Sequence, residues 1–336
     1  MNNEPLIQAT DLTIKYETSS EDIVAVSDAT FTINQGEYFG LVGESGCGKS
    51  TLAKSIIGGL DSNGYVDSGE LLYRGTDISN MSEQELNKEI RWKEISFIPQ
   101  SSMDNLDPLR RINEQAIELA EVHTDFSRQE ALNQFEEMFE IVGISPERIT
   151  DYPHQFSGGM QQRAIIALSL FLKPSVVIAD EPTTALDVIM QDQIFKYLDQ
   201  IRDDLQMSML LITHDISLVF ESCDRMAVMH AGQIAEAGHV TDVYDEPRHP
   251  YSILLQEAFP DVRNPNKELK IIEGKPPQHL GEVASCSFVE RCPWSTEDCR
   301  AAAPPAEEVE PNHVVSCIHA NRVYEDRYSP QEEADD

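Results

Sequence analysis

The sequence predicts an α/β fold built on a parallel sheet, and three observations lead to that prediction. Short apolar runs at residues 38–42, 176–179 and 209–213 have the length and composition of fully buried strands. Residues 166–245 alternate between strand-like and helical runs. Polar residues suited to chemistry follow each apolar run, which places a candidate site at the carboxyl edge of the sheet, where parallel α/β sheets bind ligands.

A glycine-rich loop follows the first apolar run and fits the pattern G-x-x-x-x-G-K-[ST] without a mismatch. With the threonine that comes next, its residues are Gly43, Glu44, Ser45, Gly46, Cys47, Gly48, Lys49, Ser50 and Thr51. Glycines allow backbone angles that turn N–H groups towards phosphate oxygens at a helix N-terminus. Lys49 is expected to reach the β- and γ-phosphates and Ser50 to ligate Mg²⁺. The predicted fold class is therefore that of a P-loop NTPase.

Two acidic residues follow the strand predicted over 176–179. Asp180 is placed to hold the Mg²⁺ shell, and Glu181 is the candidate general base or water-orienting group for attack on the γ-phosphate. His214 follows the run over 209–213, where a γ-phosphate sensor would be needed. Each feature alone could be structural. Their order after the phosphate loop and a Ser-Gly-Gly motif indicates ATP hydrolysis between two facing copies of one domain.

This ordered series resembles the nucleotide-binding subunit of an ABC transporter. The resemblance covers about residues 6–255 by motif and continues to about 320 by subfamily pattern. It implies that Tyr16 stacks on adenine, and that Gln100 touches Mg²⁺ and senses the membrane partner. Ser50, Gln100 and Asp180 are thus the expected magnesium ligands. Lys49, Gln100, Glu181 and His214 are the expected catalytic residues.

The resemblance also implies contacts across a dimer. Ser157, Gly158 and Gly159 match the signature that closes over ATP held by the opposite subunit. Asp187 matches the loop that crosses the dimer interface, and His214 matches the switch histidine. Met160 stands at the fifth position of the signature, where the family usually has glutamine, and is interpreted as typical of the peptide-importer branch. No catalytic position is missing.

Three further segments resemble the ATPases of dipeptide and oligopeptide importers. They are residues 100–108, the His-Pro-Tyr-Ser segment at 249–252, and the Gly-Lys-Pro-Pro segment at 274–277. Relatives of this kind serve peptides, nickel chelates and, in some archaea, sugars, so the solute stays open among these. The resemblance implies as partners a second ATPase, with a homologous heterodimer favoured, two transmembrane subunits and an extracellular solute-binding protein.

The chain carries a formal net charge of −34, from 59 acidic and 25 basic residues. Such a surface repels nucleic acid and anionic lipid. It resembles proteins of a cytoplasm with multimolar salt, where screening shortens to about 3 Å at 1 M. We therefore expect a haloarchaeal, halophilic protein whose folding weakens in low salt; an acidic mesophilic protein is the alternative. A soluble ABC ATPase acting on ribosomes or DNA ends is disfavoured by this charge and by the single motif set.

No apolar stretch approaches the 18 or more residues of a membrane span, and no leader pattern occupies the N-terminus. The longest candidate, residues 164–172, is expected to be a buried helix. We expect a soluble subunit that reaches the cytoplasmic face of the cell membrane through partner proteins.

The predicted organisation has three parts. Residues 1–255 form the nucleotide-binding domain, with an antiparallel β start over 6–35 and a helical subdomain at about 101–165. By resemblance, a groove of the helical subdomain receives a coupling helix of the transmembrane subunit. Residues 256–325 form a small, irregular, cysteine-containing extension, and 326–336 form an acidic tail expected to be disordered.

Four of the six cysteines lie in this extension at spacing C-x5-C-x6-C-x17-C: Cys286, Cys292, Cys299 and Cys317. The spacing matches neither a zinc ribbon nor a ferredoxin run, and disulfides are disfavoured in a reducing cytosol. Four thiols in a segment with few apolar residues to bury suggest a structural metal site. By resemblance, some peptide-importer ATPases hold a [4Fe–4S] cluster at matching cysteines; zinc and unmetallated thiols are the alternatives. Loss of a cluster is expected to loosen the tail without altering the phosphate loop.

Overall fold

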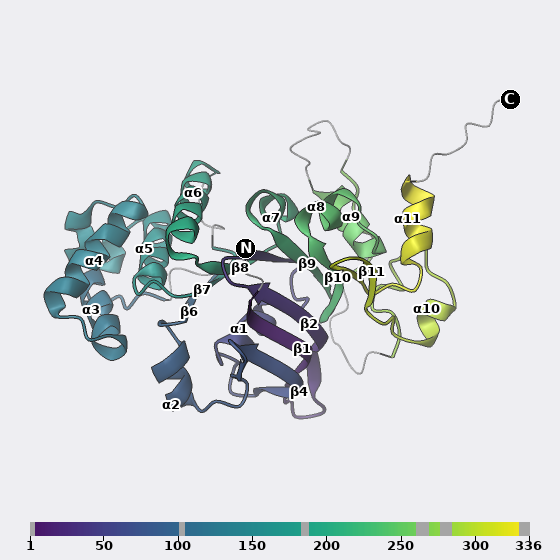
Figure 1. Cartoon of the computed structure of the whole chain (residues 1–336), viewed down its shortest axis with the longest axis horizontal. Coiled ribbons are helices and arrows are strands. Elements are labelled where there is room, and N and C mark those ends of the chain that lie inside the picture. The colour runs from purple at the N-terminus through teal and green to yellow at the C-terminus, as the bar shows by residue number, and fades with distance from the viewer. Residues whose placement is uncertain (1–3, 101–104, 183–187, 260–268, 276–283, 329–336) are drawn as a thin grey trace.

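The computed structural model describes residues 4–100, 105–182, 188–259, 269–275 and 284–328. Within them, the strands form a four-stranded sheet in the order β2-β1-β4-β5 and an eight-stranded sheet in the order β11-β12-β10-β9-β3-β8-β7-β6. Figure 1 shows α3, α4 and α5 at one end of the molecule and α10 and α11 at the other, with the larger sheet between them.

The smaller sheet is antiparallel. It contains β1 (Pro5–Tyr16), β2 (Ile23–Asn34), β4 (Gly64–Tyr73) and β5 (Thr76–Asp77). β1 pairs with both β2 and β4, and register shifts in both ladders accompany the positive φ angles of Asp11 and Asp28. The antiparallel start expected over residues 6–35 is confirmed.

The larger sheet has a parallel centre. Its parallel strands are β3 (Tyr38–Val42), β6 (Ile95–Ile98), β7 (Val176–Asp180), β8 (Ser208–Thr213) and β9 (Arg225–His230), after which β10 (Gln233–His239) returns antiparallel to β9. Tyr38 and Val42 belong to one core cluster, whereas Phe39 and Leu41 belong to the other. Because alternate residues point to opposite faces and both faces are covered, these strands read as continuous apolar runs.

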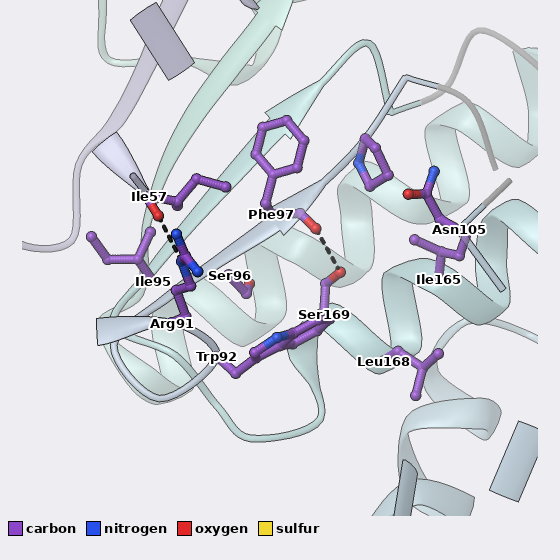
Figure 2. A pocket seen from close by; sticks show the side chains of 11 residues that line it. Ile57, Arg91, Trp92, Ile95, Ser96, Phe97, Asn105, Ile165, Leu168 and Ser169 are labelled. Carbon is purple, nitrogen blue, oxygen red and sulfur yellow. Dashed lines mark hydrogen bonds between the residues drawn. The ribbon is translucent and has the colours of Figure 1, made fainter. Parts of the chain in front are cut away.

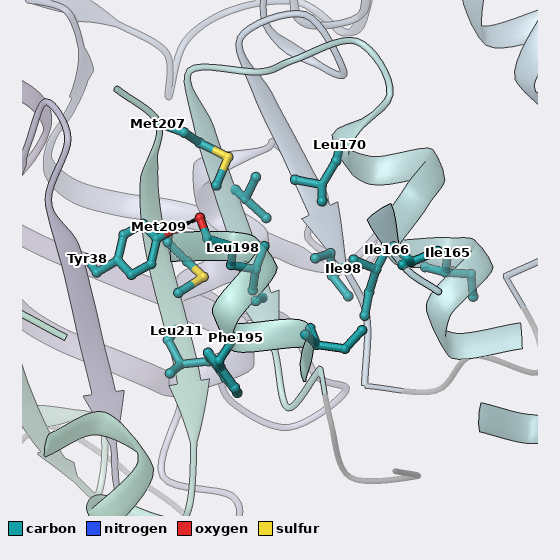
Figure 3. Packing of buried hydrophobic residues seen from close by; sticks show 14 of the residues in the cluster. Tyr38, Ile98, Ile165, Ile166, Leu170, Phe195, Leu198, Met207, Met209 and Leu211 are labelled. Atoms are coloured by element: carbon teal, nitrogen blue, oxygen red, sulfur yellow. Dashed lines mark hydrogen bonds between the residues drawn. The ribbon is translucent and has the colours of Figure 1, made fainter. Parts of the chain in front are cut away.

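Helices cover the sheet and form a separate arm. They are α1 (Lys49–Ile56), α2 (Glu83–Glu85), η1 (Leu86–Ile90), α3 (Ile112–His123), α4 (Arg128–Ile141), η2 (Pro146–Thr150), η3 (Pro153–Gln155), α5 (Gly158–Leu170), α6 (Val188–Leu205), α7 (Ile216–Ser222), α8 (Val240–Asp245) and α9 (Pro250–Ala258). Figure 3 shows side chains of α5 and α6 packed beside the strands, where the Tyr38 hydroxyl donates to the Leu198 carbonyl at 2.6 Å. None of the helices in the described ranges is long and apolar enough to cross a bilayer.

The apolar centre of the arm formed by α3, α4 and α5 is continuous with one face of the larger sheet, since its residues belong to the same core cluster as Tyr38 and Val42. Ser127 begins α4 as a capping box with Glu130. Phe135, fully buried, lies 4.8 Å from Phe139 and 5.4 Å from Phe171 between ring centroids. These contacts fix α4 against the end of α5, so the helical arm is packed onto the nucleotide-binding core.

The C-terminal region is more regular than the sequence predicts. It contains α10 (Asp298–Ala301), β11 (Glu307–Glu310), β12 (His313–Val315) and α11 (Ala320–Tyr328). β12 pairs with β10 and so extends the larger sheet. The fully buried Glu236 of β10 accepts the backbone N–H groups of Arg248 and His249 and contacts His313 Nε2 at 2.7 Å.

This regularity corrects two expectations. An irregular extension was expected over residues 256–325 from its proline content, yet its described part contains α10, β11, β12 and most of α11. The strands are short, and β12 pairs with β10 beside buried polar contacts rather than through an apolar pattern. A disordered tail was expected from residue 326, yet residues 326–328 belong to α11. The remainder of that tail lies outside the described residues.

Candidate functional site

The phosphate loop joins β3 to α1, as the glycine pattern predicts. Gly48 is the N-cap of α1 with φ +106°, and a Cβ there would lie 2.5 Å from the carbonyl oxygen of Ala25. A Cβ on Gly43 would lie 2.1 Å from the carbonyl oxygen of Met229. Only glycine fits these two positions, because the obstructing atoms are backbone atoms of neighbouring strands. The loop therefore turns tightly over β2 and β9.

The loop lysine is folded onto its own loop. Lys49 is 7% exposed, and its ammonium donates to the carbonyl oxygens of Gly43 at 2.8 Å and Glu44 at 2.9 Å. On the other side, the Tyr16 hydroxyl lies 3.3 Å from Thr51 Oγ1 at the first turn of α1. Lys49, which is expected to bind phosphate, and Tyr16, which is expected to stack on adenine, thus both border the N-terminus of α1. The helix dipole favours an anion there.

The predicted magnesium residues meet beside this helix. Asp180 ends β7 with only 5% exposure, and the Ser50 hydroxyl is close enough to its carboxylate to act against the rise of its pKa. Burial raises the pKa of Asp180, and the nearby Glu181 charge adds to that shift. A divalent cation would favour the ionised carboxylate, so a hydroxyl and a carboxylate side by side are a suitable pair of ligands for Mg²⁺.

Three strand ends bring Glu181, Gln100 and His214 together. Gln100 Nε2 donates to one carboxylate oxygen of Glu181 at 2.8 Å, and His214 Nδ1 lies 3.0 Å from the other oxygen. Glu181 has φ +47°, a conformation that costs a non-glycine residue energy and is common at functional sites. Because β6, β7 and β8 are adjacent and parallel, the residues that follow them converge although they are far apart in sequence.

The signature residues lie in the helical arm, apart from the phosphate loop. Ser157 is exposed and caps α5 by accepting the Met160 N–H at 3.4 Å, and Gly158 and Gly159 form its first turn. Gln162 is buried and donates to the Pro182 carbonyl at 2.7 Å. This bond links the signature helix to the segment after Glu181. Asp187 lies outside the described residues.

A groove lies between β6, α5 and the segment that follows η1, with a cavity of about 260 Å³. Figure 2 shows the pocket lined by Trp92 and Phe97 and by Ile165 and Leu168 of α5, with Asn105 next to Ile165. Trp92 has φ +66°, and the Arg91 guanidinium donates to the carbonyl oxygens of Ile57 and Gly58. The groove is thus apolar, shaped by a strained aromatic residue, and adjacent to the segment that leads to Gln100.

All four cysteines of the extension line one small, mainly apolar cavity: Cys286, Cys292, Cys299 and Cys317. Burial raises the pKa of Cys292 to about 11 and that of Cys317 to about 12, so both are neutral thiols at pH 7. Among the described residues, no group of three His, Cys, Asp or Glu side chains is arranged to hold a metal ion. The four cysteines lie around one cavity, as a structural metal site would require, but their side chains are not arranged to coordinate one metal ion.

Two contacts of the phosphate loop were not anticipated from the sequence. Tyr251, interpreted only as part of a subfamily segment, accepts the Glu44 N–H, and Arg291 of the extension forms an ion pair with Glu44. The extension therefore contacts the phosphate loop directly, and the expected effect of losing a cluster from the extension stays a prediction. No sequence motif marked Arg291; its position next to Cys292 was the single available signal.

The residues of this site together define a class of protein. A glycine-rich loop caps a helix beside Ser50 and Asp180, and a carboxylate at the next strand position contacts a glutamine and a histidine. Such a site binds a nucleoside triphosphate with Mg²⁺ and hydrolyses it. The chain is therefore a P-loop ATPase.

Comparison with known proteins agrees with this class. Residues 26–184 match the ABC transporter family, and residues 235–299 match the C-terminal region of oligopeptide/dipeptide transporters. The oligopeptide transport ATP-binding protein OppD of Escherichia coli (strain K12) is 40% identical over 94% of this chain and 93% of its own. A probable peptide ABC transporter ATP-binding protein of Sinorhizobium fredii is 38% identical over 95% of this chain and 96% of its own.

Solved structures show the same fold. The ATP-binding cassette MJ0796, as a dimer bound to ADP and Pi, aligns with TM-score 0.64 and 28% identity over 70% of this chain and 98% of its own. The chain belongs to the ATP-binding proteins of ABC transporters, in the oligopeptide/dipeptide branch. These relatives leave the expected halophilic character untested.

Proposed function

We propose that the chain is the ATP-hydrolysing, energy-coupling subunit of an importer for oligopeptides or dipeptides. The observation that supports it most directly is the meeting of Gln100 and His214 on the Glu181 carboxylate. The relatives named above are oligopeptide and peptide transport proteins, which favours a peptide as the solute. Nickel chelates and sugars remain alternative solutes with the same mechanism.

Each residue of the site has a part in ATP hydrolysis. The loop N–H groups and Lys49 bind the phosphates, while the ring of Tyr16 stacks on adenine. Ser50, Asp180 and Gln100 would hold Mg²⁺, which would supply positive charge to the β- and γ-phosphates. Glu181 takes the proton of the attacking water, and its φ of +47° holds the carboxylate at the strand end.

His214 and Gln100 adjust this carboxylate. Both lie within 3.0 Å of Glu181, one on each oxygen, so they fix its orientation before water enters. Gln100 follows the strand that borders the groove, and so connects the carboxylate to the surface where a membrane subunit would dock.

A second ATPase subunit completes the site in this proposal. Ser157 is exposed at the N-terminus of α5, where its helix can receive the phosphates of a nucleotide bound to another copy. The related cassette MJ0796 is described as a dimer bound to ADP and Pi, which supports such a pair. A homologous heterodimer, two transmembrane subunits and an extracellular solute-binding protein complete the proposed assembly.

The groove beside Trp92 is the proposed docking place for a helix of a transmembrane subunit. It is apolar, it lies on the helical arm, and it is adjacent to the chain that carries Gln100. This docking would place the subunit at the cytoplasmic face of the membrane. Trp92→Ala should lower co-purification with the transmembrane subunits, whereas Tyr65→Ala, an exposed aromatic on β4, should leave it unchanged.

A [4Fe–4S] cluster in the extension is part of the proposal because Cys286, Cys292, Cys299 and Cys317 line one cavity. The thiols would have to lose their protons and move closer, since they do not form a metal-ligand group as they stand. Anaerobically purified protein should contain about four iron atoms per chain with cluster absorbance in the visible range. Protein with neither iron nor zinc would remove the cluster from the proposal.

Peptide uptake in cells tests the central claim. Cells lacking this subunit should fail to import a labelled dipeptide at native salt, and the wild-type chain should restore import. Glu181→Gln should not restore it, because the base is lost while the shape of the side chain is kept. The same change at Glu70, exposed on β4, is the matched control and should restore import fully. Restoration by Glu181→Gln, or unchanged uptake on deletion, would contradict the proposal.

A further inference from the structure

The first turn of the phosphate loop is held by residues far from it in the sequence. The two terminal nitrogens of Arg291, Nη1 and Nη2, donate to the two carboxylate oxygens of Glu44 at 2.7 and 2.8 Å. The Tyr251 hydroxyl accepts the Glu44 backbone N–H at 2.9 Å. Both the side chain and the main chain of Glu44 are therefore fixed from the C-terminal part of the protein.

Arg291 is held in a fixed orientation for this contact. Its side chain is 6% exposed, and its Nε donates to the Glu273 carbonyl at 3.0 Å. Gly274 has φ +85°, and a Cβ there would lie 3.2 Å from Arg291 Cγ, so the chain passes close to the arginine stem. The guanidinium also lies 5.6 Å from the ring centroid of Phe288. Because the planar guanidinium of Arg291 is already restrained in this orientation, it forms two hydrogen bonds to a carboxylate with little further loss of side-chain entropy.

Tyr251 is fixed by the same group of side chains. Its ring centroid lies 5.3 Å from that of Phe288 and 4.6 Å from that of His230. His230 Nδ1 lies 3.1 Å from Ser287 Oγ, which precedes Phe288 in the extension. Tyr251 of α9 and Arg291 of the extension thus belong to one packed cluster beside the phosphate loop.

Glu44 matters to the loop in two ways. Its carbonyl oxygen, with that of Gly43, accepts the hydrogen bonds of the Lys49 ammonium, so a shift of Glu44 moves the acceptors of the lysine that binds phosphate. Its carboxylate is also a negative charge in a loop that binds an anion. Unpaired, that charge would repel the phosphates, and Arg291 offsets it. Consistent with this pairing, the Arg291 hydrogen bond is the largest cause of the lowered pKa of Glu44.

We propose that Arg291 is a positioning residue for ATP: it holds Glu44 with Tyr251, offsets the Glu44 charge, and so lets the C-terminal extension set the ATP affinity of the phosphate loop. The inference rests on the proposed ATPase function. The contact between Arg291 and Glu44 does not require a metal at the cysteines, although Arg291 and Cys292 are neighbours in the sequence.

Equilibrium binding of a fluorescent ATP analogue with Mg²⁺ to the full-length chain tests the proposal. Arg291→Gln should weaken binding about tenfold, since it leaves the Glu44 carboxylate unpaired beside the phosphates. Glu44→Gln combined with Arg291→Gln should bind within about threefold of wild type, because the unpaired charge is gone. Arg300→Gln is the matched control, since Arg300 pairs with Glu290 on the exposed surface of the same extension, and it should bind like wild type.

The double variant separates loss of the charge offset from a loss of folding, because Tyr251 still holds the Glu44 backbone N–H in it. A misfolded fraction would lower the number of binding sites and leave the dissociation constant unchanged, and Glu44→Gln would not reverse it. The proposal is overturned if Arg291→Gln binds within about twofold of wild type, or if the double variant binds no better than Arg291→Gln alone. Failure of the wild-type chain to bind ATP would instead contradict the proposed function.

Discussion

Replacing Gly48 by alanine should impair ATP binding far more than the same replacement at Gly46. Both glycines lie in the phosphate loop, with φ of +106° at Gly48 and +79° at Gly46. At Gly48 the added Cβ would lie 2.5 Å from the Ala25 carbonyl oxygen and 2.9 Å from Met229 Cε, whereas at Gly46 it meets nothing within 4 Å. The two variants therefore share a backbone penalty and differ in a steric one.

The magnitude follows from those contacts. Backbone strain costs about 1–2 kcal/mol at either position. At Gly48 the loop and β2 must also move apart by about 1 Å, because ordinary contact begins near 3.4 Å. Overpacking of this kind costs about 1–3 kcal/mol, and about 1.4 kcal/mol is a tenfold change in affinity. We expect Gly48→Ala to bind ATP about tenfold to a hundredfold more weakly than Gly46→Ala.

The assay is titration of each full-length variant with a fluorescent ATP analogue and Mg²⁺, with urea unfolding as the control for folding. Unfolding separates weaker binding from a smaller folded fraction. Equal dissociation constants for the two variants would refute the reasoning, because the shared φ penalty would then account for the whole effect.

Further predictions concern stability. Burial lowers the pKa of His249 to about 4, so the folded state excludes a proton that the unfolded chain binds below about pH 6.5, and stability should fall as pH drops through that window. His249→Asn keeps an acceptor for the Tyr251 N–H but cannot titrate, so urea unfolding at pH 7 and 5 should show a smaller pH dependence; an unchanged dependence would count against this. Phe135→Ala should lose about 3–5 kcal/mol in the same assay, and Leu109→Ala, 85% exposed, less than about 0.5; similar losses would contradict the packing argument. If the acidic surface is halophilic, the wild-type melting temperature should rise steeply with KCl, and full thermal stability in dilute buffer would exclude the halophilic interpretation.

The sequence anticipated the fold because its local patterns are strong. The buried strands read as apolar runs, and the phosphate loop reads as a strand, a glycine turn and a helix, which the structure has as β3, residues 43–48 and α1. The C-terminal region was misjudged for the opposite reason. β11 and β12 are short, and the place of β12 beside β10 depends on Glu236, His313 and other side chains distant in sequence. The periodicity of apolar residues predicts local helices and strands, and it does not predict contacts between residues distant in sequence.

By itself, the sequence determined which residues can bind phosphate and hydrolyse ATP, since glycine, lysine, serine and carboxylate at fixed spacing follow from the chemistry of the bound nucleotide. Only the tertiary structure decided what surrounds them. Adjacent parallel strands bring Gln100 and His214 onto opposite oxygens of Glu181. Folding of the C-terminal region brings Arg291 onto Glu44 across 247 positions of sequence. Contacts of that separation depend on how whole elements pack, and spacing along the chain does not encode them.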